Sequence, residues 1–363
     1  MFTIEDAPKF AGTQISVKSP GELSLYIKEN EKYRKEQNKR NFMSASLDGL
    51  KENEKYKIER LRILGPLNGN DILFIREMAG SDFIGEKTNG KLRYLDLSGA
   101  YFEYEGLCSQ NFSSGWHTIR GCISMFMFSN CISLQSILIP SNTTLICENA
   151  FSGCANLLSV LINSSIEDIS SRSFAFCDKL ERISIRNNRY YSVENKGKIL
   201  INKQEELILC LNSIFNKQDD IYLKKDFIKI PDKITTIKKG AFYRCTIDNL
   251  AISKNIKHIE SKSFQNCRIK SLYIFSNQLK IHKEGFFDCH YFDISSSIYC
   301  LSENPPIYEG DRIDFVTKTT FLFVPMAALH KYKQDPIWKI CNIIPLSLDE
   351  IDIIEKKYNN ISL

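Results

Sequence analysis

The stretch "ENAFSGCANL", residues 148–157, has a close copy on each side of it in the sequence. "MFMFSNCISL" occupies residues 125–134 and "SRSFAFCDKL" occupies residues 171–180, so a Phe-x-x-Cys pair returns every 23 residues. A reactive group is usually needed once, whereas this cysteine recurs. The interval therefore indicates an internal repeat, and periods of 20–50 residues are typical of solenoids.

Six copies of the Phe-x-x-Cys motif can be aligned, and several apolar positions stay in phase with them. An isoleucine stands five residues before each phenylalanine, and the pattern L-x-x-I-x-I follows the cysteine in the earlier copies. The later copies lack one residue after the cysteine, which shortens the interval to 22. The motif residues are Phe128, Phe151, Phe174, Phe242, Phe264 and Phe286, with Cys131, Cys154, Cys177, Cys245, Cys267 and Cys289.

The repeat has a simple physical interpretation. L-x-x-I-x-I suits a short strand whose alternate side chains point inward, and the phenylalanine fills the interior of the turn. One such unit cannot bury its apolar side alone, but stacked units share a continuous core. The repeated cysteine is then expected to be a small buried side chain. A disulfide between neighbouring rungs and a chemical role are the two alternatives.

Longer turns precede the motif. The triplets Ile58, Leu61, Ile63 and Leu92, Leu95, Leu97 match an L-x-x-L-x-L strand pattern. Between the triplets, residues 72–78 predict a short helix that ends at Gly80. The expected fold is therefore an α/β to mainly β solenoid, a right-handed leucine-rich-repeat superhelix with short outer helices or turns and terminal caps.

The patterns divide the chain into four expected segments. The first contains a capping helix predicted over 19–40 by the capping box at Ser19 and Glu22. The solenoid is clearest at 119–185 and 234–290, and its degenerate turns at 186–233 include "YYSVENKGKILINKQEELILCL", which predicts hairpins. The end is predicted to carry a strand, a short helix and a final strand as a cap, followed by a charged tail that frays. The boundaries are 1–57, 58–297, 298–346 and 347–363.

Composition excludes some classes of function. The chain has 363 residues, of which 25% are charged, and its net charge of +5 is too small and dispersed to favour nucleic acid. No run of about 18 apolar residues predicts a membrane span. The start "MFTIEDAPKF" lacks the features of a signal peptide, so the protein either stays where it is made or has lost a leader.

Catalytic and metal-binding patterns are absent from the sequence. It contains no C-x-x-C, H-E-x-x-H, G-x-S-x-G or G-x-G-x-x-G. Cys108, His117 and Cys122 form a C-x8-H-x4-C arrangement, which keeps a thiol enzyme as a remote alternative but matches no strong template. We therefore expect a protein without enzymatic activity, metal or cofactor.

A solenoid offers its strands as a broad sheet, and the residues between the buried positions form its surface. This row lacks a dominant charge, which favours a protein or glycan partner over DNA. The candidate partner-binding residues are Ser136, Leu138, Ser159, Leu161, Arg182, Ser184, Asn249, Ala251, Ser271 and Tyr273.

The pattern I-x-x-x-[AS]-F-x-x-C-x-x-L-x-x-I-x-I, seen in "ICENAFSGCANLLSVLI", resembles the BspA-like leucine-rich repeats of bacterial surface proteins. The ending "YCLSENPPIYEG…TTFLFVPMAALHKYKQDPIWKICNII" is similar to the closing segment of that family. The resemblance covers roughly residues 50–346. It implies a secreted or surface-displayed recognition and adhesion protein, with a lipid anchor possible upstream, that binds host, matrix or neighbouring-cell proteins. A cytoplasmic location, and self-assembly through the terminal rungs, are the alternatives.

Overall fold

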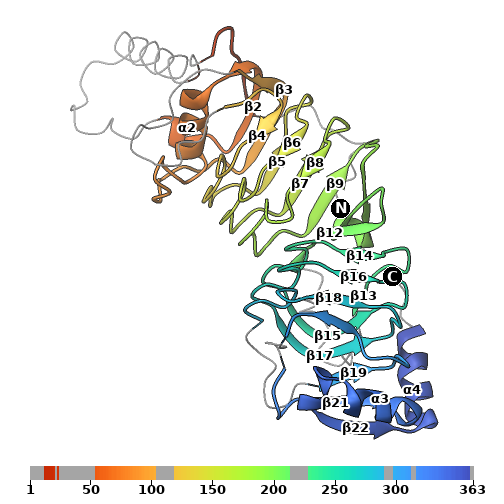
Figure 1. Ribbon diagram of the computed structural model, residues 1–363. Helices are drawn as coiled ribbons and strands as arrows, with labels where there is room; N and C mark the ends of the chain where they lie inside the picture. Colours follow the sequence, from red (N-terminus) through yellow and green to blue (C-terminus); the bar gives the residue numbers. More distant parts are fainter. Residues whose placement is uncertain are drawn as a thin grey trace, which may run out of the picture. The chain divides into compact units, whose positions relative to one another are not determined.

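The computed structural model describes residues 12–20, 23, 54–103, 118–212, 228–289, 297–311 and 316–359. The chain divides into two compact units, Met1–Arg189 and Tyr190–Leu363 (Figure 1). Each unit is a stack of β-rungs, which confirms the predicted leucine-rich-repeat solenoid. The helix predicted over 19–40 lies outside the described residues except at 19, 20 and 23. Cys108 and His117 also lie outside them.

The first unit contains two parallel sheets whose strands come from successive rungs. A 3₁₀ helix, η1 (Glu54–Lys57), lies in the chain between the first two strands of the larger sheet. The larger sheet has the order β1 (Thr13–Ser16), β2 (Arg60–Leu67), β3 (Tyr94–Phe102), β5 (Ser136–Leu138), β7 (Ser159–Ile162) and β9 (Arg182–Ile185). The smaller sheet has the order β4 (Cys122–Ile123), β6 (Leu145–Ile146) and β8 (Asp168–Ile169).

Helix α2 (Gly69–Met78) is the short helix that the sequence predicts. Asn68 caps its N-terminus, since its side chain accepts from the Asp71 N–H while the Asp71 carboxylate accepts from the Asn68 N–H. The helix ends before Gly80, whose φ of +97° is accessible to glycine at little cost. Buried Arg76 donates to the carbonyl oxygens of Asp82 at 2.8 Å and Phe126 at 3.1 Å, and so fixes α2 to the first Phe-x-x-Cys rung.

The second unit opens with the predicted hairpins and continues as parallel rungs. Its first sheet has the order β10 (Tyr191–Glu194), β11 (Ile199–Asn202), β12 (Glu206–Cys210), β14 (Thr236–Ile237), β16 (His258–Ile259), β18 (Lys280–His282) and β20 (Ile307–Glu309), with the 3₁₀ turn η2 (Asn195–Gly197) between β10 and β11. Its second sheet has the order β13 (Ile228–Lys229), β15 (Thr246–Ile252), β17 (Arg268–Ile274), β19 (Ser297–Cys300), β21 (Phe321–Pro325) and β22 (Asn342–Leu346).

The motif phenylalanines stack along the core of each unit. Ring centroids lie 5.5 and 5.3 Å apart from Phe128 through Phe151 to Phe174, with interplanar angles near 10°. The corresponding distances from Phe242 through Phe264 to Phe286 are 4.8 and 4.7 Å in the second unit. The stacking spacing approaches the separation of neighbouring strands, because each ring is carried by one rung.

The repeated cysteines are buried free thiols, as the sequence predicts. Their environment contains a hydrogen bond that the pattern alone did not reveal. The Cys154 thiol donates to the Phe128 carbonyl oxygen on the preceding rung at 3.0 Å, and Cys267 donates in the same way to Phe242 at 2.7 Å. The thiol is therefore a second donor to a carbonyl oxygen that also accepts a backbone N–H from its own rung.

The turn before each motif cysteine has a left-handed backbone. The residues with this positive φ are Asn130, Gly153, Phe176, Arg244, Asn266 and Asp288, at 50–78°. Glycine, asparagine and aspartate adopt this conformation more readily than other residues, whereas a bulky side chain is strained in it. Four of the six rungs therefore use a favourable residue, and Phe176 and Arg244 do not.

The end of the second unit carries the predicted strand, helix and final strand. After β21 come η4 (Met326–Ala328), α3 (Leu329–Gln334), η5 (Trp338–Ile340) and β22. Trp338 is fully buried, and its indole N–H donates to the Pro306 carbonyl oxygen at 2.8 Å. Buried Tyr332 exchanges a hydrogen bond of 2.8 Å with the Ser302 hydroxyl.

The prediction that the tail frays is wrong for residues 348–359, which form helix α4 (Leu348–Asn359). Its Ile351, Ile354 and Tyr358 are the least exposed, at the spacing of one helix face. The Tyr358 ring stacks on Phe275 at 4.2 Å and its hydroxyl hydrogen bonds with an Asp232 carboxylate oxygen at 3.2 Å. This packing, rather than local propensity, orders the segment.

Candidate binding surfaces

The outward face of the larger sheet in the first unit carries six of the predicted residues. Buried Ile137, Val160 and Ile183 alternate with outward positions along β5, β7 and β9. Arg182 is exposed, and the other five predicted residues, Ser136, Leu138, Ser159, Leu161 and Ser184, are partly exposed. All six lie on the outward side, and whether they bind a partner stays a prediction.

Strand register assembles these residues into two rows. One row runs through Tyr94, Ser136, Ser159 and Arg182, and the other through Asp96, Leu138, Leu161 and Ser184. The Ser159 hydroxyl donates to the Ser136 hydroxyl at 3.0 Å. At the N-terminal end of the rows, the Arg60 guanidinium lies 4.3 Å from the Tyr94 ring centroid, and Arg62 pairs with Asp96 at 2.7 Å. The face is therefore mixed, with charged side chains at both ends of the rows and serine and leucine between them.

In the second unit, Asn249, Ser271 and Tyr273 are partly exposed on the outward face, as predicted. Ala251 is a correction, because its side chain is fully buried. It occupies an outward position in the register, beside Tyr273 on the next strand. Its side chain ends at Cβ while its neighbour is a large ring, so the methyl group is shielded from water. A partner cannot contact Ala251 directly.

The sequence reasoning missed two residues that continue the row from Tyr273. Tyr299 and Phe323 occupy the equivalent position on β19 and β21. The three rings stack with centroids 4.4 and 4.6 Å apart and interplanar angles of 5° and 10°. We call Tyr273, Tyr299 and Phe323 the aromatic stripe. The signal that could have found it is the shared pattern in "SLYI", "SIYC" and "FLFV", but β19 and β21 lie beyond the last Phe-x-x-Cys copy.

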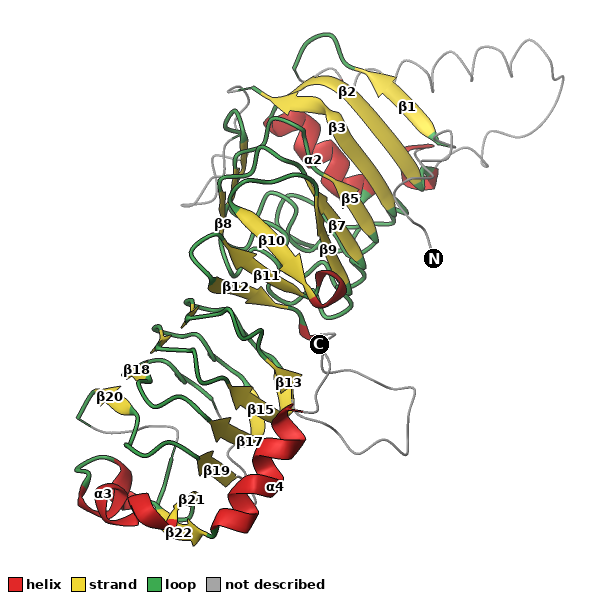
Figure 2. Cartoon of the chain, turned by 90° about the vertical axis from the view of Figure 1, so that its right-hand side faces the viewer, coloured by secondary structure: helices red, strands yellow, loops and turns green. Residues whose placement is uncertain are grey.

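The aromatic stripe lies on the surface, not in the core. All three rings remain partly exposed, while the residues that directly precede them in each strand, Leu272, Ile298 and Leu322, are fully buried on the other side of the sheet. Burial raises the pKa of Tyr273 to about 12, so its phenol is a neutral donor at physiological pH. Figure 2 shows α4 running alongside β13, β15 and β17, and its Tyr358 contacts Phe275 just beyond β17. The stripe is thus bordered by a helix that the sequence reasoning did not predict.

The thiol-enzyme alternative has little support in the described residues. Cys108 and His117 fall outside them, and the Cys122 sulfur lies 3.5 Å from the Cys147 sulfur. Burial, followed by this hydrogen bond, raises the pKa of Cys122 to about 12, which disfavours the nucleophilic thiolate. Within the described ranges, no group of three or more His, Cys, Asp or Glu side chains could hold a metal ion.

Comparison with known proteins identifies a repeat family that this chain matches. A family profile described as "BspA type Leucine rich repeat region" matches six copies, over residues 100–196 and 219–304. Similar solved structures include the pneumococcal vaccine antigen PcpA, at 12% identity, 80% coverage of each chain and a TM-score of 0.36. A leucine-rich cell surface protein from Faecalibacterium prausnitzii A2-165 has 15% identity, coverage of 82% of this chain and 76% of its own, and a TM-score of 0.39.

A third solved structure, a leucine-rich repeat protein from Eubacterium ventriosum, has 16% identity, coverage of 84% of this chain and 90% of its own, and a TM-score of 0.38. No curated protein gives a match. Among the helices that the structure describes, none combines the length and apolar character of a membrane span.

Proposed function

The chain belongs to the BspA-type leucine-rich repeat family, and from this premise we propose that it is a non-enzymatic recognition protein that binds a protein partner through the outward sheet face of its second unit. The aromatic stripe is the observation that carries the proposal. Three adjacent aromatic rings outside the core have no role in closing the stack, since the motif phenylalanines already fill its interior.

Aromatic side chains dominate the energetics of protein interfaces, because they bury a large area at a small cost in side-chain entropy. The stripe also holds its rings in a fixed stack before binding, which reduces the ordering cost further. The two phenols supply hydrogen-bond donors at the edge of an otherwise apolar surface. These features favour a protein partner, and a glycan is the second outcome that the experiment below can return.

We place the protein at the cell surface or outside the cell, with host, matrix or neighbouring-cell proteins as partners. The family membership supports this location. Self-assembly through a terminal rung is less well supported, because Pro345 lies in β22, the last strand of its sheet, and lacks the N–H that edge pairing needs.

The test measures binding of the full chain to a panel of purified extracellular-matrix and cell-envelope proteins by surface plasmon resonance, and binding to a neutral glycan array in parallel. For any partner found, the double variant Tyr299→Thr with Phe323→Thr is expected to weaken binding at least about tenfold. Threonine keeps the β-propensity of these positions. The matched control, Ser136→Ala with Ser159→Ala on the first unit, is expected to leave affinity within about twofold.

Circular dichroism must show that both variants keep the fold. The proposal is overturned if the folded threonine variant binds every partner as the wild type does, or if only a neutral glycan array gives a signal that the stripe variant abolishes.

A further inference from the structure

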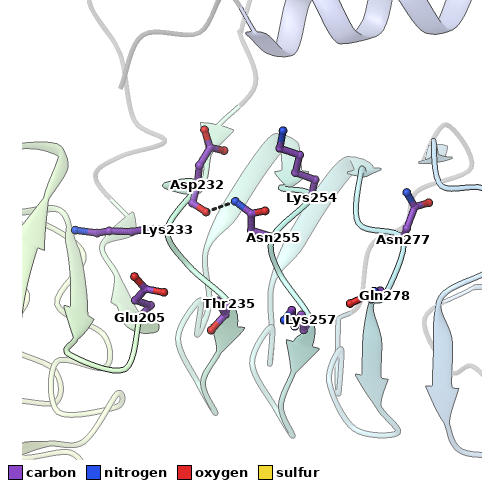
Figure 3. A pocket seen from close by; sticks show the side chains of 9 residues that line it. All are labelled: Glu205, Asp232, Lys233, Thr235, Lys254, Asn255, Lys257, Asn277 and Gln278. Carbon is purple, nitrogen blue, oxygen red and sulfur yellow. Dashed lines mark hydrogen bonds between the residues drawn. The ribbon is translucent and has the colours of Figure 1, made fainter.

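A polar hollow lies on a different face of the second unit, against the sheet that contains β14, β16 and β18. It has a volume of about 450 Å³, within the range of ligand sites. Figure 3 shows that its side chains come from the turns and strands of successive rungs. We call it the basic hollow. It is lined by Glu205, Asp232, Lys233, Thr235, Lys254, Asn255, Lys257, Asn277 and Gln278.

The rungs around the basic hollow carry a larger net positive charge than the whole chain. Residues 228–289 contain twelve basic and five acidic residues, a net of +7, although the whole chain carries only +5. The equivalent motif rungs of the first unit, residues 118–189, contain six basic and five acidic residues. The same repeat therefore folds with a near-neutral surface in the first unit. The excess of positive charge in the second unit is not required by the fold.

Some of these lysines form ion pairs within the unit, and others do not. Lys238 pairs with Glu260 at 2.6 Å and with Glu206 at 3.5 Å, which links three rungs. By contrast, Lys254, Lys257 and Lys280 are exposed, and their ammonium groups make no hydrogen bond, ion pair or ring contact with any residue that the structure describes. Lys257 and Lys280 lie on consecutive rungs, since His258 pairs in register with Lys280. Lys280 is in register with His258 and not with Lys257, so the two lysines lie on neighbouring rungs about 4.8 Å apart but one position out of step along the strand.

The other groups of the basic hollow suit hydroxyl-rich ligands. Asn255 donates to the Asp232 carbonyl oxygen at 2.6 Å, which holds its amide in place, and Asn277 accepts the Glu303 N–H at 2.9 Å. The side-chain NH₂ of Asn277 therefore keeps its donors, and the carboxylates of Glu205 and Asp232 supply acceptors. The lining contains no arginine and no aromatic ring. Single-stranded nucleic acid is usually held by stacking on aromatic rings, and two carboxylates repel a row of phosphates.

We propose that the basic hollow, together with Lys280, binds a linear anionic polysaccharide. Sulfate or carboxylate groups along the polymer pair with Lys254, Lys257 and Lys280, and sugar hydroxyls hydrogen bond with the amides and carboxylates of the lining. This site is separate from the aromatic stripe, so it adds a second ligand to the proposed protein-binding function and does not depend on it.

The test is isothermal titration of the full chain with four probes. Heparin supplies sulfate groups, polygalacturonate supplies carboxylates alone, dextran is neutral, and a twenty-nucleotide poly(dT) represents nucleic acid. The expected result is binding of heparin or polygalacturonate, no binding of dextran, and affinity that falls as salt is raised. The two anionic polymers separate sulfate from carboxylate recognition.

The triple variant Lys254→Gln, Lys257→Gln, Lys280→Gln is expected to weaken binding of the anionic polysaccharide by about tenfold or more, as the sum of three exposed charge contacts. By analogy with DNA binding, the slope of log Kd against log salt should fall by about one for each lysine removed. The control Lys87→Gln with Lys91→Gln changes exposed lysines of the first unit and should alter affinity less than twofold.

Two further outcomes decide the proposal. A triple variant that binds heparin and polygalacturonate like the wild type overturns it, as does tighter binding of poly(dT) than of either polysaccharide. Glu205→Gln tests the hydroxyl contacts, because a purely electrostatic surface would bind more tightly after loss of a carboxylate, whereas a site that uses this acceptor should bind about as well or more weakly.

Discussion

For single residues, the repeated cysteine shows how one side chain serves both packing and hydrogen bonding. Its thiol is small enough for the interior, and the S–H of Cys154, Cys177 and Cys267 donates to the carbonyl oxygen of the phenylalanine one rung earlier. Serine would make a stronger hydrogen bond but would cost more to bury, and alanine would remove the thiol's hydrogen bond and leave the carbonyl oxygen with only its backbone N–H donor. The recurrence of cysteine thus has a physical explanation that requires no reactivity.

Burial of these thiols predicts how stability depends on pH. Burial raises the pKa of Cys289 and of Cys341 to about 12, above the value of about 8.5 for an unfolded thiol. The folded state therefore holds its protons where the unfolded state has lost them. Their contribution is complete below pH of about 8.5 and is lost as the pH rises toward 12.

Urea denaturation at pH 8 and pH 10 should show a lower midpoint at pH 10. The fall should be smaller in Cys289→Val, which removes one titrating thiol. An unchanged midpoint in the wild type between these pH values would contradict the prediction.

Phe176 offers a stabilising substitution. Its φ of +59° places a bulky side chain in the left-handed region, and 43% of its surface is exposed. Phe176→Asn is expected to raise the free energy of unfolding by about 0.5–1 kcal/mol, since asparagine tolerates this backbone. Phe287, which is 40% exposed and lies outside the left-handed region, is the matched control. Thermal denaturation should show a gain for Phe176→Asn and none for Phe287→Asn.

Among the secondary-structure elements, α4 shows most clearly how packing overrides a local expectation. The segment is rich in charge and looks like a fraying tail, yet one face of the helix packs on the second unit through Ile351, Ile354 and Tyr358. A helix of twelve residues is marginal alone in water. Its order therefore depends on contacts such as the Tyr358 ring on Phe275.

Tyr358→Ala is expected to release α4 from the sheet. Loss of the stack on Phe275 and of the hydrogen bond with Asp232 should lower the free energy of unfolding by about 2 kcal/mol. Hydrogen exchange at the amides of residues 348–359 should accelerate while exchange in β15 and β17 stays slow. Ile353→Ala, at a position 53% exposed on the same helix, should change neither. Uniformly faster exchange across the second unit would show that α4 does not detach separately.

For the chain as a whole, the open end of a stack of rungs is its weak point, because the last rung has no neighbour to bury its apolar side. In the second unit, β22 and the buried Trp338 close this end. The indole is fully buried and hydrogen bonds with Pro306, so it fixes the closing segment to the chain about 30 residues earlier.

Trp338→Ala is expected to lower the free energy of unfolding by about 3–5 kcal/mol, the usual cost of removing a large buried ring. The uncovered end should also bind the dye ANS and raise light scattering. Ile340→Ala, two residues away and 40% exposed, is the control and should do neither. A Trp338→Ala protein with wild-type stability would show that other residues close the core.

Periodicity alone predicted the solenoid, the buried phenylalanines and cysteines, and the outward side of each strand, because one register keeps every apolar position inward and a slip would expose them all. It also predicted α2, from its apolar spacing and its glycine stop. Periodicity predicted no surface residues beyond the last copy of the motif. Ala251 is buried by a neighbour on another strand, and the rings of Tyr299 and Phe323 meet Tyr273 only because degenerate rungs keep the register. The docking of α4 and the convergence of lysines from separate turns at the basic hollow likewise depend on packing between residues distant in sequence, which no local pattern specifies.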